Sequence, residues 1–304
     1  FIIHVTFLTW PVASLGYTIN LIQRSAASQE RIAKLMREPE EISDSEITDY
    51  SINSIKGDVE YKNVTFRYPE SELPAVKNLS VNVTAGQTLG IVGKTGSGKS
   101  SIVQLIPRLF DATTGTVLVD GVDIRTIPLD VLRKNIGFVP QDTFLFSDTI
   151  KENISFGVEN ATNAEVTEAA NKAQVLENIL DFEKKFDTFL GERGITLSGG
   201  QKQRTSIARA LIKKPPILIL DDSLSAVDTH TENEILKHLK EEMKDKTTFI
   251  VSHRISSVKN ADQIIVVEDG QIMEFGTHES LLANKGYYSR MYEKQLLEIE
   301  LAEL

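Results

Sequence analysis

Residues 93–100, Gly-Lys-Thr-Gly-Ser-Gly-Lys-Ser, constrain the fold more than any other part of the sequence. They match the pattern G-x-x-x-x-G-K-S in full and directly follow the apolar run Leu-Gly-Ile-Val. A strand that leads into a glycine-rich loop and then a helix directs several backbone N–H groups at one anion. Glycine permits both the tight loop and a close approach of the backbone to that anion. The pattern therefore predicts a loop that binds the phosphates of a nucleotide.

Within this loop the side chains have separable expected tasks. Lys99 is expected to reach the β- and γ-phosphates, and the Ser100 hydroxyl is expected to ligate Mg²⁺. The residues predicted to contact the nucleotide are Gly93, Lys94, Thr95, Gly96, Ser97, Gly98, Lys99, Ser100 and Ser101.

The surrounding sequence predicts an α/β domain. Short apolar runs that alternate with helical segments indicate parallel strands buried on both faces. These runs span residues 88–92, 136–139, 217–220 and 248–251. Residues 59–68 alternate like a half-buried strand with one break. Asp-Gly pairs between apolar alternations predict hairpins over residues 114–124 and 263–276.

The N-terminal stretch differs from the rest. Residues 1–22 contain no Asp, Glu, Lys or Arg, and basic residues follow from Arg24 onward. This predicts the cytoplasmic end of a membrane helix, with residues 1–23 in contact with the membrane. A buried helix of a soluble protein is the alternative, because the stretch also holds polar residues; a helix that lines a polar cavity reconciles both properties. A start at Phe1, without a basic leader or cleavage site, fits a fragment better than a secreted precursor.

A change of composition separates this helix from the α/β domain. Residues 38–56 are acidic, polar and nearly free of large apolar side chains, and Pro39 favours a helix end just before them. The expected organisation is a helix and its extension over residues 1–37, a linker over 38–56 and the domain over 57–304.

Composition excludes several classes of function. The formal net charge of -10 argues against a nucleic-acid partner, which would require a basic face. The absence of cysteine excludes disulfides, thiolate metal sites and cysteine catalysis. The five histidines lack metal-binding spacing.

Motifs downstream of the loop resemble those of one family. Residues Leu197, Ser198, Gly199, Gly200 and Gln201 open a helix and resemble the signature motif of ABC-type ATPases. The apolar run that ends at Asp221 resembles the Walker B element, residues 225–228 resemble the D-loop with Asp228, and His253 resembles the switch histidine. Gln141 matches the Q-loop, and Tyr68 matches the aromatic residue that stacks on adenine. Singly, Tyr68, His253 and Gln141 fit ordinary structural roles, so only their joint placement over residues 57–304 makes them candidates.

The resemblance implies a fold and a mechanism. The fold would be a P-loop NTPase of ABC type, with a parallel core sheet, an antiparallel β subdomain and an α-helical signature subdomain, preceded by a helix of a transmembrane domain. Two such domains would close head-to-tail on two ATP molecules, each lying between the Walker A loop of one chain and the signature of the other. Mg²⁺ would be held by Ser100, Gln141 and Asp221, and catalysis would involve Asp222, His253 and Gln141.

Further features resemble the exporter branch of the family. Residues 191–194, Gly-Glu-Arg-Gly, resemble the exporter X-loop, and residues 141–146 resemble exporter sequence after the Q-loop. An importer ATPase would lack a membrane helix on the same chain, and the DNA-repair relatives would carry long coiled coils between Lys99 and Ser198. The resemblance thus implies half of an exporter in the cell membrane, similar to multidrug-type transporters, with its ATP-binding domain on the cytoplasmic side. It also implies a second half-transporter as partner and drugs or other amphipathic molecules as substrates.

Asp222 departs from the family pattern, in which a glutamate follows the Walker B aspartate and polarises the attacking water. Aspartate is one methylene shorter, so its carboxylate retreats by about 1.5 Å if the backbone stays in place. The interpretation is a slow, degenerate site in a heterodimer, with the intact signature completing the partner's site. A backbone shift that restores ordinary hydrolysis is one alternative, and a subunit that mainly holds ATP to regulate its partner is another.

Overall fold

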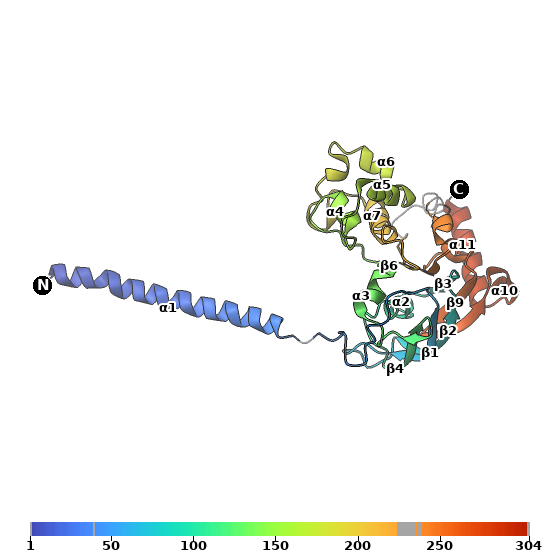
Figure 1. Ribbon diagram of the computed structural model, residues 1–304, viewed down its shortest axis with the longest axis horizontal. Coiled ribbons are helices and arrows are strands. Elements are labelled where there is room, and N and C mark those ends of the chain that lie inside the picture. Colours follow the sequence, from blue (N-terminus) through green and yellow to red (C-terminus); the bar gives the residue numbers. More distant parts are fainter. Residues whose placement is uncertain (1, 39, 224–234, 236, 238, 303–304) are drawn as a thin grey trace. The chain divides into compact units, whose positions relative to one another are not determined.

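The computed structural model describes residues 2–38, 40–223, 235, 237 and 239–302 (Figure 1). Contacts divide the chain into two units, Phe1–Ser43 and Asp44–Leu304. Each unit is described by itself. The predicted D-loop, with Asp228, lies outside the described residues.

The first unit contains one long helix, α1 (Ile2–Met36), which spans 35 residues. Within the described residues it is the helix long and apolar enough to cross a membrane, by length and composition. Its threonines are compatible with an apolar surrounding because Thr6, Thr9 and Thr18 donate their hydroxyl hydrogens to helix carbonyls four residues earlier. The predicted helix is therefore present, and it ends before Pro39.

A six-stranded sheet forms the centre of the second unit. Its order is β10-β9-β3-β8-β7-β6. The bounds are β3 (Thr88–Gly93), β6 (Ile136–Val139), β7 (Ile217–Asp221), β8 (Thr247–Val251), β9 (Gln263–Glu268) and β10 (Gln271–Gly276). All neighbours pair in parallel except β10, which pairs antiparallel with β9. Every residue of β7 and β8 is buried, which confirms the prediction of a parallel core sheet covered on both faces.

A second, antiparallel sheet has the order β2-β1-β4-β5. It comprises β1 (Val59–Phe66), β2 (Val76–Val83), β4 (Thr114–Val119) and β5 (Val122–Asp123). The predicted hairpins form at Asp120-Gly121 and Asp269-Gly270, where all four residues have positive φ angles. Two central residues in that conformation match the twist of the flanking strands. The break predicted in the first strand appears as register shifts between Tyr61 and Val64 and between Val64 and Phe66.

Helices complete the domain. They are α2 (Lys99–Gln104), α3 (Leu129–Lys134), α4 (Ile150–Ser155), α5 (Asn163–Lys172), α6 (Leu176–Leu180), α7 (Gly199–Leu211), α9 (Ile255–Val258), α10 (His278–Ala283) and α11 (Tyr287–Ala302), with 3-10 turns at Lys185–Asp187 and Glu192–Gly194. Helices α4 to α7 lie together in Figure 1, as expected of a helical signature subdomain. One core cluster joins α2 to both sheets, and Tyr61 donates a buried hydrogen bond of 2.9 Å to the carbonyl of Ile102.

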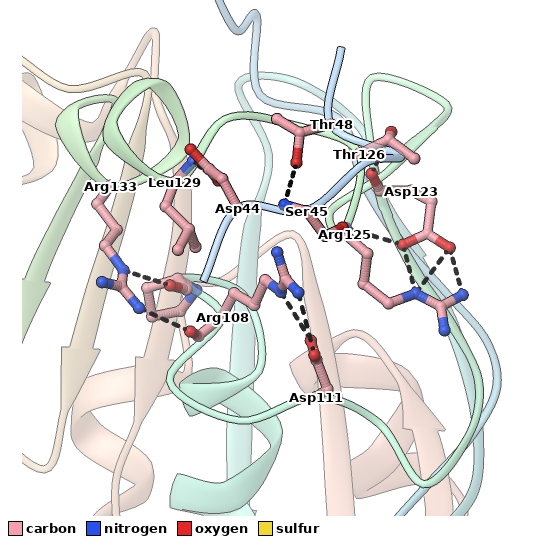
Figure 2. A network of polar contacts seen from close by, with 11 residues as sticks. Asp44, Ser45, Thr48, Arg108, Asp111, Asp123, Arg125, Thr126, Leu129 and Arg133 are labelled. Atoms are coloured by element: carbon pink, nitrogen blue, oxygen red, sulfur yellow. Dashed lines mark hydrogen bonds and ion pairs between the residues drawn. The ribbon is translucent and has the colours of Figure 1, made fainter. Parts of the chain in front are cut away.

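The acidic segment that precedes β1 is hydrogen-bonded to the domain from Asp44 onward. The Asp44 carboxylate accepts from the backbone N–H of Leu129, at the start of α3, over 3.0 Å (Figure 2). Further along, the Asp120 carboxylate accepts from the N–H groups of Lys56, Gly57 and Asp58 over 2.6 to 3.0 Å. The segment has the composition of a linker, but these carboxylates fix its path.

Arginines lie beneath the same segment. Arg108 is buried and its guanidinium bonds both carboxylate oxygens of Asp111 over 2.8 and 3.1 Å (Figure 2). Arg133 donates to the carbonyls of Pro107 and Arg108, so the turn after α2 is held from α3.

Candidate functional site

The candidate residues lie at the carboxyl ends of neighbouring parallel strands. The phosphate loop follows β3, Gln141 follows β6, Asp221 ends β7 with Asp222 directly after it, and His253 follows β8. In an open α/β sheet this edge is where ligands bind. Four segments that are far apart in the sequence are thus brought to one edge of the sheet.

Two glycines of the loop, Gly93 and Gly98, are required by close contacts as well as by their backbone angles. Gly93 has φ 154°, and a Cβ there would lie 2.1 Å from the carbonyl oxygen of Val267. Gly98 has φ 97°, and its Cβ would lie 2.1 Å from the carbonyl oxygen of Ala75. Neither position accepts a side chain, because both obstacles are backbone atoms. The buried Ser97 hydroxyl has no hydrogen-bond partner, so the loop retains a polar group available to a ligand.

Lys99 lies within the loop and is only 5% exposed. Its Nζ donates to the carbonyls of Gly93 and Lys94 over 3.0 and 2.7 Å. Burial lowers the pKa of Lys99, while the nearby carboxylates of Asp222 and Asp221 oppose that shift. A cation of this kind, surrounded by backbone groups, is suited to bind phosphate oxygens.

Ser100 and Asp221 form a pair of oxygen donors. The Ser100 hydroxyl donates to Asp221 Oδ1 over 2.9 Å, and Asp221 is 1% exposed. Burial raises the pKa of Asp221, the Ser100 hydrogen bond opposes this, and the charge of Asp222 adds to it. No group of three or more metal-binding His, Asp or Glu side chains occurs within the described residues. The pair nevertheless fits Mg²⁺, which binds through one or two protein oxygens together with phosphates and water. Gln141, the third predicted ligand, is exposed at the start of the loop after β6.

Asp222, His253 and Lys99 lie within electrostatic reach of one another: Asp222 raises the pKa of Lys99, and Lys99 lowers the pKa of His253. Burial lowers the pKa of His253, and the charge of Lys99 lowers it further; Asp222 and a hydrogen bond with the Gly93 backbone oppose the shift. Asp222 has φ 44°, and its N–H donates to the carbonyl of Val251 over 2.9 Å. The backbone of Asp222 is thus fixed to β8 in a left-handed conformation that aspartate tolerates better than most residues.

Tyr68 lies beside the first turn of α2. Its hydroxyl is 3.0 Å from Ser101 Oγ and 3.2 Å from Gln104 Oε1. Its half-buried ring packs edge-on against Phe66 and Phe110, with centroid distances of 4.7 and 5.2 Å. The predicted adenine-stacking residue therefore lies next to the phosphate loop, and the hydroxyl of Ser101 faces Tyr68.

The signature residues form the N-terminus of α7. Ser198 is the N-cap, and its hydroxyl accepts from the N–H of Gln201 over 3.3 Å. The Gln201 side chain in turn accepts from the N–H of Ser198 over 3.0 Å, which completes a capping box. Leu197 is buried, whereas Ser198 and Gly199 are exposed and Gly200 is partly so. The predicted helix start is confirmed, and its exposed end is available to a second molecule.

The segments that resemble exporter sequence lie side by side. Leu145 contacts the position where Gly194 would carry a Cβ, and the N–H of Leu190 donates to the carbonyl of Asp148 over 2.8 Å. Phe144, Phe146 and Phe156 are exposed, and their rings contact one another. Phe189 and Ile195 are exposed as well. The rings of Phe146 and Phe156 are 4.5 Å apart, and the Arg209 guanidinium lies over both.

Two residues that hold other segments in place carry no functional signal in the sequence, and the first of them lies beside the site. Gln295 of α11 hydrogen-bonds the backbone beside His253, and Asp120 holds the segment before β1. Gln295 is a single glutamine in a helix, far along the chain from His253, and belongs to no motif. Asp120 lies in an Asp-Gly pair, which predicts a turn and nothing more.

Comparisons with known proteins agree with this geometry. The family model described as "ABC transporter" matches residues 76–225. The chain is 44% identical over 297 residues to the uncharacterized ABC transporter ATP-binding protein YknU of Bacillus subtilis (strain 168), covering 98% of this chain and 51% of that protein. It is 39% identical to an ATP-dependent lipid A-core flippase of Syntrophus aciditrophicus (strain SB), covering 100% of this chain and 50% of the flippase.

A solved structure of a bacterial Atm1-family ABC exporter with ATP bound superposes with a TM-score of 0.84 at 37% identity, covering 95% of this chain and 50% of that one. The chain thus spans about half the length of the relatives it matches. The fold is that of the ABC ATPase domain, with the mixture of parallel and antiparallel sheets predicted from the sequence. The chain therefore contains an ABC transporter nucleotide-binding domain and is homologous to ABC exporters.

Proposed function

We propose that this chain is the ATP-binding part of an ABC half-transporter that couples ATP binding and hydrolysis to export from the cell. The observation that carries the proposal is the arrangement at one sheet edge. There Lys99 bonds the phosphate-loop backbone, Ser100 bonds Asp221, and His253 lies within the electrostatic influence of Lys99 and Asp222. These are the groups that phosphoryl transfer requires, because its catalysis consists mainly of positioning and of charge stabilisation.

In this proposal each group has one task. Loop N–H groups and the Lys99 ammonium bind the phosphates, and in doing so Lys99 exchanges its bonds to Gly93 and Lys94 for bonds to phosphate oxygens. Ser100 and Asp221, with Gln141 from the loop after β6, hold Mg²⁺, which would neutralise charge on the phosphate oxygens. His253 contacts the γ-phosphate, Tyr68 supports the adenine, and Asp222 orients the attacking water.

The proposal includes slow hydrolysis at this chain's own site. The backbone N–H of Asp222 is bonded to the carbonyl of Val251, and Asp222 directly follows the last residue of β7. A backbone held at both points has little freedom to advance the shorter carboxylate, and a displacement of about 1 Å can lower a rate on the order of a hundredfold. Asp222 thus favours ATP binding over turnover.

The same observation favours a second candidate function. If hydrolysis at this site is very slow, the chain acts mainly as a nucleotide-gated subunit that holds ATP while its partner hydrolyses. Single-turnover trapping of labelled ATP in each site of the mixed dimer separates the two functions. Retention over many partner cycles supports the regulatory function, and release in every cycle supports the transport ATPase.

Coupling to a membrane domain is supported by two features. Helix α1 is long and apolar enough to cross a bilayer, so residues 1–23 would lie in the cell membrane with the ATP-binding domain on the cytoplasmic side. The exposed cluster of Phe144, Phe146 and Phe156 offers an apolar surface for a membrane-domain segment. Drugs and other amphipathic molecules are the proposed substrates, in line with the relatives described as multidrug and lipid transporters.

The partner is proposed to be a second half-transporter that joins head-to-tail, so that the exposed signature at Ser198 and Gly200 covers the ATP of the partner's phosphate loop. The test is ATP turnover by the 304-residue chain, alone and mixed with a candidate partner chain. Replacement of Asp222 by Asn should reduce turnover much less than replacement of the partner's catalytic carboxylate. Equal losses from both replacements would contradict a degenerate site, and brisk hydrolysis by the chain alone would contradict the need for a heterodimer.

A further inference from the structure

The side chain of Gln295 connects the C-terminal helix α11 to the loop that carries His253. Its Oε1 accepts from the backbone N–H of Ile255 over 2.8 Å, and its Nε2 donates to the backbone carbonyl of His253 over 2.7 Å. Both partners lie about 40 residues earlier in the chain. One amide thus bonds two backbone groups of the same short loop, one on each side of Arg254.

The loop needs this support because α9 is a short helix without a local cap. It has four residues, Ile255–Val258, and its N-cap residue Arg254 forms no side-chain capping bond. The first N–H groups of a helix lack partners within the helix, so the N–H of Ile255 requires an acceptor from elsewhere. Gln295 supplies that acceptor. The reversed amide would direct an NH₂ group at an N–H and an oxygen at a carbonyl, so the two bonds also fix its orientation.

Helix α11 is itself held in place near its start. The Glu274 carboxylate accepts from the N–H groups of Tyr287 and Tyr288. Tyr288 is fully buried, and its hydroxyl is 2.8 Å from His278 Nδ1. Gln295 lies seven residues after Tyr288, on the same face of the helix. Because α11 is held in place, the position of the Gln295 amide relative to the His253 loop is fixed.

Displacement of the His253 backbone would be transmitted to the phosphate loop. The His253 ring lies close to the Gly93 backbone at the start of that loop and within the electrostatic influence of Lys99 and Asp222. The loop has local support on its other side, where Ser252 Oγ accepts from the N–H of Arg254 over 2.9 Å and lies 3.1 Å from Ser257 Oγ. From α11, the Gln295 side chain supplies a hydrogen bond to the backbone carbonyl of His253.

We infer that Gln295 is a positioning residue for His253, so that the C-terminal helix sets the geometry of the switch histidine against the phosphate loop. The inference rests on the proposed ATPase function for its kinetic consequences. It adds an element of the fold, α11, to the parts on which turnover depends.

A double-mutant cycle tests the inference in the 304-residue chain combined with its partner. Gln295→Leu removes both bonds, and we expect kcat to fall about tenfold while the KM for ATP changes less than twofold, because ground-state contacts to ATP remain. In a His253→Ala background the same replacement should have no further effect on kcat, since Gln295 acts through His253.

A second variant, Gln295→Glu, keeps the acceptor for Ile255 but turns an oxygen toward the His253 carbonyl. It should lower kcat by a similar factor to Gln295→Leu. Lys294→Ala on the exposed face of α11 is the matched control and should leave kcat unchanged.

A spectroscopic measurement on the chain without nucleotide separates this inference from the proposed function. The imidazole resonance of His253, assigned by its loss in His253→Ala, should shift in Gln295→Leu and Gln295→Glu and titrate at higher pH, nearer the ordinary histidine value, as the ring leaves its buried position. An unmoved resonance, or a loss of kcat that persists in the His253→Ala background, would overturn the positioning role. Absence of ATP binding by the unmutated chain would instead overturn the proposed function.

Discussion

Among single residues, Asp222 has the largest predicted effect on turnover. Replacement by Glu adds the missing methylene on a backbone that is bonded to Val251. We expect the rate of ATP hydrolysis at this site to rise at least tenfold, because a general base must lie within hydrogen-bond distance of the attacking water. ATP affinity should change little, since Lys99 and the loop are untouched. Single-site turnover of trapped ATP measures the gain. Asp222→Asn, which also tolerates the left-handed backbone, is the control. An Asp222→Glu variant no faster than the native chain would show that the length of the side chain does not limit hydrolysis.

His253 makes the stability of the domain depend on pH. Its pKa is lowered in the folded chain by burial and by Lys99, relative to 6.5 when unperturbed. Above the unfolded pKa the imidazole is neutral in both states, and this part of the free energy of unfolding is fully present. As pH falls below about 6.5 the unfolded chain binds the proton first, so stability is lost until the folded pKa is passed. Between about pH 7 and 5, the free energy of unfolding should therefore fall less in His253→Gln than in the native chain. Denaturant unfolding at several pH values measures this difference.

At the scale of elements, Asp120 joins a hairpin to the segment that enters the domain. Its backbone lies in the β4–β5 turn with φ 53°, and its carboxylate accepts from three N–H groups of residues 56–58. Asp120→Gly preserves the turn and removes the acceptors, so we expect a loss of about 2 kcal/mol in the free energy of unfolding. Asp120→Asn retains an acceptor oxygen and tolerates the turn, and its loss should be clearly smaller. Equal losses in chemical denaturation would show that the carboxylate bonds contribute little.

At the scale of the whole molecule, the proposed function requires a second chain. We expect ATP to promote association of the chain with its partner, because the exposed N-terminus of α7 can bind an anion presented by another molecule. Ser198→Glu should abolish that association by charge repulsion, while ATP binding to the chain's own phosphate loop persists. Crosslinking or light scattering with and without ATP measures the first effect, and nucleotide binding measures the second. Association that is unaffected by Ser198→Glu would exclude the signature from the interface.

Much of the architecture was determined by local sequence. Buried runs such as residues 217–220 become parallel strands because they are apolar throughout, and the Asp-Gly pairs become hairpins because those residues tolerate positive φ angles. The loop with Lys99 and the cap at Ser198 follow from spacing alone, since both depend on neighbours within a few residues. These features need no information from distant parts of the chain.

The tertiary structure decided what depends on contacts between distant segments. Asp120 has a local sequence that predicts only a turn, yet its carboxylate holds residues 56–58 about 60 positions away. Gln295 resembles any polar residue of a helix until the fold places it against His253. The sequence by itself predicted which groups would bind phosphate. Only the fold decided which residues hold those groups in position, because a hydrogen bond requires a partner within about 3 Å and spacing along the chain does not reveal it.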